Sequence, residues 1–149
     1  MMKVFLDTNV FIEYFERREL FETVSDIFDA IEDGRIEAVI SSGSLYTITY
    51  LLTIGLKRMN IHRPEQTEKL RSALNGVLDL ATVVDISHTN MSVAINDKAF
   101  SDIEDSFQYH CALQNKCTHL ITINLKDYKK VDSNSIEILS PMEFVNQAF

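Results

Sequence analysis

Glycine, proline and cysteine are scarce in this sequence: its 149 residues include four Gly, two Pro and two Cys. Neither glycine-rich phosphate-binding motif, GxGxxG or GxxxxGKS/T, occurs, so a nucleotide-cofactor site of those kinds is not predicted. Cys111 and Cys117 are too few for a disulfide framework and, even with His110 and His119, lack the paired spacing of a structural zinc site. No apolar run approaches the ~20 residues of a membrane-spanning helix, and no secretory signal pattern opens the chain. We therefore expect a soluble, cytoplasmic protein.

Basic residues are also few: fourteen Lys and Arg stand against twenty-two Asp and Glu, a formal net charge of -8. This balance argues against a protein that binds nucleic acid through a broad basic surface. It does not exclude a nucleic-acid enzyme whose bound divalent ions supply the local positive charge. The most basic local stretch is the loop over 124–135, which contains Lys126, Lys129 and Lys130.

Short apolar segments alternate with helical patterns along the chain, which predicts an α/β fold with a mainly parallel sheet of four to five strands and helices on both faces. The length predicts a single domain, 1–149. The third helix is apolar nearly all round, so we expect it in the core or at a subunit interface. Expected strands are 3–6, 36–40, 82–86, 119–123 and 136–139. Expected helices are 10–15 (capped by Asn9), 20–33 (with Gly34 as the glycine that follows its C-terminus), 45–58, 64–80, 89–100, 102–115 and one opening at Pro141.

Two capping boxes are predicted, one from Ser101 to Glu104 and one from Ser140 to Glu143. The first would start a helix at Asp102 and place the carboxylates of Asp102 and Asp105 on one helix face. Acids in a first helical turn are also a common way to stabilise a helix through its dipole, without further function. The pair alone does not separate these alternatives.

Polar residues at strand ends suggest a site. Asp7 ends the first apolar strand, and Asn124 and Asp127 follow the fourth. Because the carboxyl ends of parallel strands converge on one crevice, these side chains could meet there with Asp102 and Asp105. Clustered carboxylates are the ligands that Mg²⁺ or Mn²⁺ prefers, and such ions can promote phosphodiester hydrolysis. Metal-assisted hydrolysis is therefore our hypothesis, and Asp7→Asn would leave activity unchanged if it were wrong.

Other chemistries fit the sequence less well. A phosphoryl-aspartate hydrolase with Asp7 as nucleophile needs a second acid two residues later, where Asn9 stands. A receiver-like phosphoacceptor domain needs paired acids near the first strand and a lysine at a late strand end. A Ser-His-Asp triad would need a nucleophile elbow, and no such motif occurs.

Three motifs, in this order and spacing, resemble those of the PIN-domain ribonucleases, the fold of VapC-type toxins: FLDTNV at 5–10, DIEDSFQY at 102–109 and LITINLKDY at 120–128. The resemblance covers essentially the whole chain. It implies a three-layer PIN-like domain and Mg²⁺- or Mn²⁺-dependent cleavage of single-stranded RNA. It further implies a homodimer and a small antitoxin protein as partner.

The resemblance also assigns roles to residues. Asp7 and Asp105 match the family's first and third acids, and Asp127 is a nearby substitute for the fourth. The resemblance implies that these three acids hold the metal, with Asp102 as an additional carboxylate. The family's second acid is usually a glutamate early in the third helix, and the alignment places Thr47 there. Because a threonine carries no charge, a degenerate PIN module that binds RNA or a protein without cleavage is the alternative. Matched polar supports are Thr8, Asn9 and Thr122, with Asn124 where many members carry the fourth acid.

Overall fold

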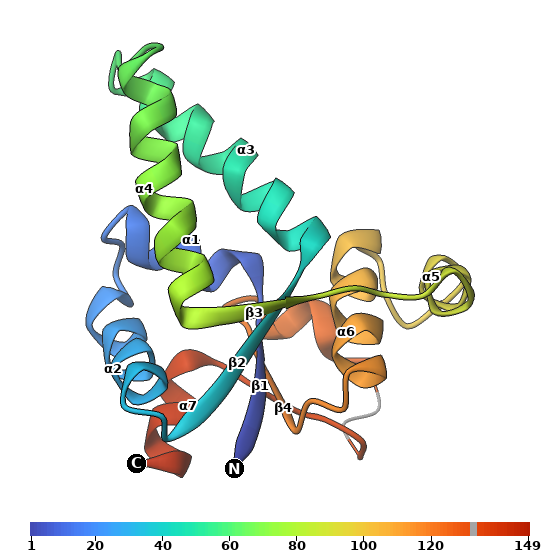
Figure 1. Cartoon of the computed structure of the whole chain (residues 1–149). Helices are drawn as coiled ribbons and strands as arrows, with labels where there is room; N and C mark the ends of the chain where they lie inside the picture. The colour runs from blue at the N-terminus through green and yellow to red at the C-terminus, as the bar shows by residue number, and fades with distance from the viewer. Residues whose placement is uncertain (132–133) are drawn as a thin grey trace.

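The structure is a computed structural model that describes residues 1–131 and 134–149. Its centre is a five-stranded sheet in the order β3-β2-β1-β4-β5, in which every neighbouring pair is parallel (Figure 1). The α/β prediction is thus confirmed, with a sheet that is parallel throughout. The strands are β1 (Met2–Leu6), β2 (Ile36–Ser41), β3 (Ala81–Val84), β4 (His119–Ile121) and β5 (Glu137–Leu139).

Helices connect the strands and cover both faces of the sheet (Figure 1). Within the described ranges they are α1 (Thr8–Phe15), α2 (Phe21–Glu32), α3 (Ser42–Arg58), α4 (Glu65–Leu80), α5 (His88–Ile95), α6 (Ile103–Gln114) and α7 (Pro141–Ala148), with the 3-10 helix η1 (Leu125–Tyr128). None of the helices in these ranges has the length and apolar character needed to cross a membrane.

Alternating side chains of the strands divide the core in two, because successive residues of a strand point to opposite faces. Val4 and Leu6 of β1 join the larger core, which packs against α1, α2, α3, α4 and α7. Phe5 between them joins the smaller core, which includes Tyr109 of α6 and Tyr128 of η1. Both faces of a parallel sheet are normally covered in this way.

The strand order reverses beside β1, and this positions the site. The chain passes from β1 outward through β2 to β3, then returns to place β4 on the other side of β1. The backbone N–H of Asp7 donates to the Ile121 carbonyl at 3.0 Å, which holds the carboxyl ends of β1 and β4 together. Such a switch point in a parallel sheet opens a crevice where ligands bind.

Several element boundaries differ from those predicted. The helix predicted over 89–100 ends at Ile95, and α3 starts at Ser42 because the Ser41 side chain caps it by accepting the Ser44 N–H at 2.9 Å. Pro64 precedes α4 as its cap and is not its first helical residue. Two predicted ends are confirmed: Gly34 follows α2 with φ +75, and Ser140 forms a capping box with Glu143 at α7.

The third helix is buried along one stripe only. Ser44, Ile48 and Leu52, four residues apart, face the core, whereas Tyr46 is 77% and Tyr50 65% exposed. The helix therefore packs on the core along this stripe, and the face with the two tyrosines stays exposed in the single chain. Coverage of the exposed face by a second subunit stays a prediction.

Candidate active site

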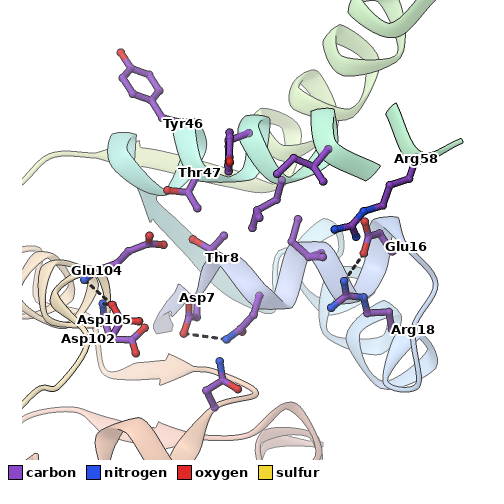
Figure 2. Close-up of a pocket in the computed structure, with 16 residues that line it drawn as sticks. Asp7, Thr8, Glu16, Arg18, Tyr46, Thr47, Arg58, Asp102, Glu104 and Asp105 are labelled. Carbon is purple, nitrogen blue, oxygen red and sulfur yellow. Dashed lines mark hydrogen bonds and ion pairs between the residues drawn. The ribbon is translucent and has the colours of Figure 1, made fainter. Parts of the chain in front are cut away.

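A cavity of about 700 Å³ opens at the carboxyl end of β1 (Figure 2). Asp102, Glu104 and Asp105 lie at one end of it, and Arg18, Arg58 and Glu16 lie at the other (Figure 2). The exposed face of α3 forms a wall between these ends. Its polar lining includes Asp7, Asp102, Glu104, Asp105, Thr47 and Asn124.

Asp7 is the most buried of these acids, with 2% of its surface exposed. Its Oδ2 accepts a hydrogen bond from the Thr122 hydroxyl at 2.7 Å, and the Asn9 amide donates to the same oxygen at 3.3 Å. The Tyr128 hydroxyl lies 3.5 Å from this oxygen. These contacts come from residues up to 121 positions away in the sequence, so the tertiary fold fixes the orientation of the carboxylate.

Asn9 does not cap a helix, contrary to the sequence-based prediction. Asp7 precedes the helix, α1 starts at Thr8, and Asn9 therefore lies within the first turn. Its amide instead bridges the strand ends: the amide nitrogen lies 3.4 Å from the Thr122 hydroxyl, and its oxygen accepts the Ile123 N–H at 3.3 Å. Asn9 and Thr122 thus support Asp7 from two segments.

The start of α6 also differs from the predicted capping box. Asp102, and not Ser101, is the cap, because its Oδ1 accepts the backbone N–H of Glu104 at 2.8 Å and of Asp105 at 3.4 Å. Asp102 consequently lies before the helix, although its carboxylate still lines the cavity beside Asp105. The Glu104 side chain, which the capping box would have turned back, lines the cavity as well (Figure 2).

Burial and neighbouring negative charges raise the pKa values of acids in this site. Burial, followed by the charges of Asp7, Asp102, Asp127 and Glu104, raises the pKa of Asp105 to about 7. Burial also raises the pKa of Asp7, although its hydrogen-bond donors act in the opposite direction. Partial burial and the charges of Asp102 and Asp7 raise the pKa of Glu104. The carboxylates therefore lack a compensating positive charge.

A hard divalent cation fits this donor set, because oxygen ligands with uncompensated negative charge are what Mg²⁺ and Mn²⁺ bind. Within residues 1–131 and 134–149, no group of three or more His, Cys, Asp or Glu side chains is arranged as a ready set of metal ligands. Mg²⁺ commonly binds through one or two carboxylates and keeps several waters. The pair Asp7 and Asp105 can serve such an ion.

Gln108 was not predicted as a site residue, yet it joins three helices beneath the acids. It is 2% exposed, and its Oε1 accepts from the Thr8 N–H at 3.1 Å and from the Ser44 hydroxyl at 3.3 Å. It also hydrogen-bonds the carboxylate of Asp7, which opposes the rise in that group's pKa. In the sequence, the only indication of this role is that a glutamine stands among the apolar positions of the helix. Because buried polar side chains are normally hydrogen-bonded, such a residue is expected to bind polar groups of neighbouring elements.

Three remaining predicted residues lie around the acids. Thr47 lines the cavity, and its hydroxyl donates to the Gly43 carbonyl at 3.2 Å within α3. Asn124 lines the cavity at the end of β4. Asp127, in η1, is absent from this lining and instead lines a neighbouring smaller cavity, although its charge still acts on Asp105. A metal-ligand role for Asp127 stays a prediction.

Comparisons with known proteins identify the family of this chain. Residues 3–126 match the PIN domain family. The chain is 27% identical over 147 residues to Ribonuclease VapC1 of Aquifex aeolicus (strain VF5), covering 95% of this chain and 92% of that protein. The crystal structure of VapBC2 from Rickettsia felis bound to a DNA fragment from their promoter contains a chain with the same fold. The TM-score is 0.66 at 15% identity, over 93% of this chain and 98% of that chain.

Proposed function

Because the chain belongs to the PIN domain family, we propose that it is a metal-dependent endoribonuclease that cleaves single-stranded RNA and serves as the toxin of a toxin–antitoxin pair. The observation that carries the proposal is the set of carboxylates of Asp7, Asp102, Glu104 and Asp105, which line the part of the cavity remote from Arg18 and Arg58, where burial and the charges of the other three raise the pKa of Asp105. Similarity to Ribonuclease VapC1 supports the same activity. In this proposal the 149 residues act as one domain in the cytoplasm.

In the proposed site, Asp7 and Asp105 would hold Mg²⁺ or Mn²⁺, and the nearby charges of Asp127 and Asp102 would supplement them. When bound, such an ion would activate a water molecule and stabilise the charge that develops on a phosphoryl oxygen. Thr122 and Asn9 orient the Asp7 carboxylate through the hydrogen bonds described above.

The other polar residues complete the proposed site. Thr8 fixes Gln108 by donating its N–H. Thr47 and Asn124 face the cavity, where they can hold metal-bound water. Because neither carries a charge, Glu104 supplies the additional carboxylate that the sequence lacks at position 47.

The test is cleavage of a labelled single-stranded RNA with Mn²⁺ or Mg²⁺, followed on a denaturing gel. We expect products with the parent protein, none after EDTA treatment, and a loss of at least about 100-fold for Asp7→Asn. Asp26→Asn, which changes an exposed carboxylate of α2, is the matched control and should cleave normally. Cleavage that persists both in EDTA and in the Asp7→Asn variant would contradict the metal-dependent mechanism.

A binding module without nuclease activity is the second candidate, and the uncharged Thr47 and Asn124 in the cavity favour it. In that case RNA or a protein partner would bind without metal, and no products would form. The same gel, run beside a filter-binding assay in EDTA, separates the two functions.

Partners are also part of the proposal. The VapBC2 structure contains a toxin with its antitoxin, which supports a cognate antitoxin for this chain. The exposed face of α3, with Tyr46 and Tyr50, supports a homodimer. Sedimentation at micromolar concentration should give the mass of a dimer, and a monomer throughout the range would remove that assignment.

A further inference from the structure

Four lysines form a second cavity beside the acids, which we call the lysine pocket: Lys98, Lys126, Lys129 and Lys130. Its volume is about 220 Å³, and Ala99, Phe100, Ser101 and Asp127 complete its lining. We propose that the lysine pocket binds the phosphodiester backbone of the RNA strand next to the bond that is cleaved. This inference rests on the proposed nuclease function and names the surface that holds its substrate.

The charge of the pocket is unusual for this protein. Although the chain carries a net charge of -8, four of its fourteen basic residues line this one small cavity. All four are exposed, and among residues 1–131 and 134–149 none of them takes part in an ion pair. Ammonium groups held near one another repel, and phosphate groups would relieve that repulsion.

The fold brings the two lysine-bearing segments together through aromatic packing. Phe100, two residues after Lys98, is buried, and its ring centroid lies 5.6 Å from that of Tyr128 in an edge-on contact. Tyr128 ends η1, which contains Lys126, and its hydroxyl reaches towards Asp7. The same aromatic pair therefore fixes the pocket and connects it to the acidic site.

The pocket and the acidic site are adjacent along both segments. Ser101 lines the pocket and the next residue, Asp102, lines the larger cavity. On the other segment, Asn124 lines the larger cavity and Lys126 lines the pocket. Figure 2 shows Asp102 and Asp105 at the end of the larger cavity remote from Arg58. A strand with its reacting phosphate among the acids would therefore continue into the lysines.

An acidic protein segment is the competing occupant, since its carboxylates could bind the same lysines. The adjacent site, however, is proposed to hold RNA, and an RNA strand with one phosphate among the acids carries further phosphates on both sides of it. The lysines next to the acids can bind those phosphates without a second partner. The position of the pocket beside the proposed nuclease site therefore favours RNA.

The test measures RNA binding apart from cleavage. Binding of a fluorescent single-stranded RNA to Asp7→Asn protein is followed by anisotropy between 50 and 200 mM salt, a range over which phosphate contacts weaken strongly. The double variant Lys126→Gln/Lys129→Gln is compared with Lys69→Gln/Lys116→Gln, which removes the same charge from exposed lysines outside the pocket. We expect the pocket variant to bind about tenfold more weakly, and its log–log salt slope to fall by about 1.4, since each phosphate contact to a single strand contributes about 0.7.

The outcomes separate this inference from the proposed nuclease function. Equal salt slopes for the two double variants, with cleavage by the parent intact, would overturn the lysine pocket alone. RNA binding with the expected slopes, but no cleavage by the parent, would support the pocket and remove the nuclease. Equal slopes with RNA, together with loss of binding to a poly-glutamate peptide only in the pocket variant, would assign the pocket to an acidic protein partner and overturn the RNA assignment. Matching melting temperatures of the two variants exclude misfolding as the cause.

Discussion

Asp105 has the pKa that responds most clearly to the negative charge of the site. It is 7% exposed, and its pKa of about 7 results from burial and then from the nearby charges of Asp7, Asp102, Asp127 and Glu104. In the metal-free folded protein the Asp105 carboxyl is therefore protonated between about pH 4 and pH 7, where the same carboxyl in the unfolded chain is ionised. Above neutral pH the ionised Asp105 therefore lowers the free energy of unfolding of the metal-free protein.

We predict that Asp105→Asn stabilises the metal-free protein at pH 8 and not at pH 4. Because the folded pKa is raised, the stability associated with the protonated carboxyl is complete below the unfolded pKa near 3.8 and is lost as the pH rises through about 7. Urea unfolding in EDTA should show the variant gaining about 1–3 kcal/mol relative to the parent between these pH values. Asp26→Asn is the control, and a similar pH-dependent gain in that variant would contradict the assignment.

Glu104 illustrates how a single cap changes a site. The sequence offers two candidate caps in succession, Ser101 and Asp102, and the choice decides where the glutamate points. With Asp102 as cap, Glu104 is free to line the cavity. The sequence already indicated Asp102 as a possible cap, since Asp is about as good a helix cap as Ser.

At the scale of the element, the start of α6 is testable. Asp102→Ala should lower the free energy of unfolding by about 1 kcal/mol, because it removes the acceptor for the Glu104 and Asp105 N–H groups. Ser101→Ala, which changes no cap, should leave stability within about 0.5 kcal/mol. Denaturant titration at pH 5 compares the two variants, and the reverse ranking would restore the predicted capping box.

The strands β1 and β4 are the elements that create the site. Both are short and apolar, and each is followed by a polar residue, Asp7 or Thr122, whose side chains meet at 2.7 Å. Their pairing depends on α/β crossovers that return the chain to β1 after β3. Helices such as α3 then supply the walls of the cavity.

At the scale of the whole molecule, divalent ions should stabilise the fold. An ion that binds only the folded protein adds about 2.7 kcal/mol when its concentration is 100 times the dissociation constant. We therefore predict that Mn²⁺ raises the melting temperature of the EDTA-treated parent by several degrees, as followed by circular dichroism. Asp7→Asn should lose most of this increase, whereas Asp26→Asn should retain it. An equal increase in all three proteins would place the ion elsewhere.

The sequence by itself determined the order of strands and helices and the parallel sheet, because alternation of apolar segments and turn residues is a local property. It also determined local ends such as Gly34 after α2 and the capping box of Ser140. Element boundaries were less certain where two caps compete, as at Ser101 and Asp102.

Only the tertiary structure decided which polar residues meet. The partners of Asp7 are Thr122 and Tyr128, more than 110 positions away, and no local pattern encodes their distances. The separation of Asp127 from the main cavity and the buried bridge of Gln108 depend equally on how helices pack on the sheet. Local residue patterns specify elements, whereas long-range packing brings charges together and so creates the chemistry of the site.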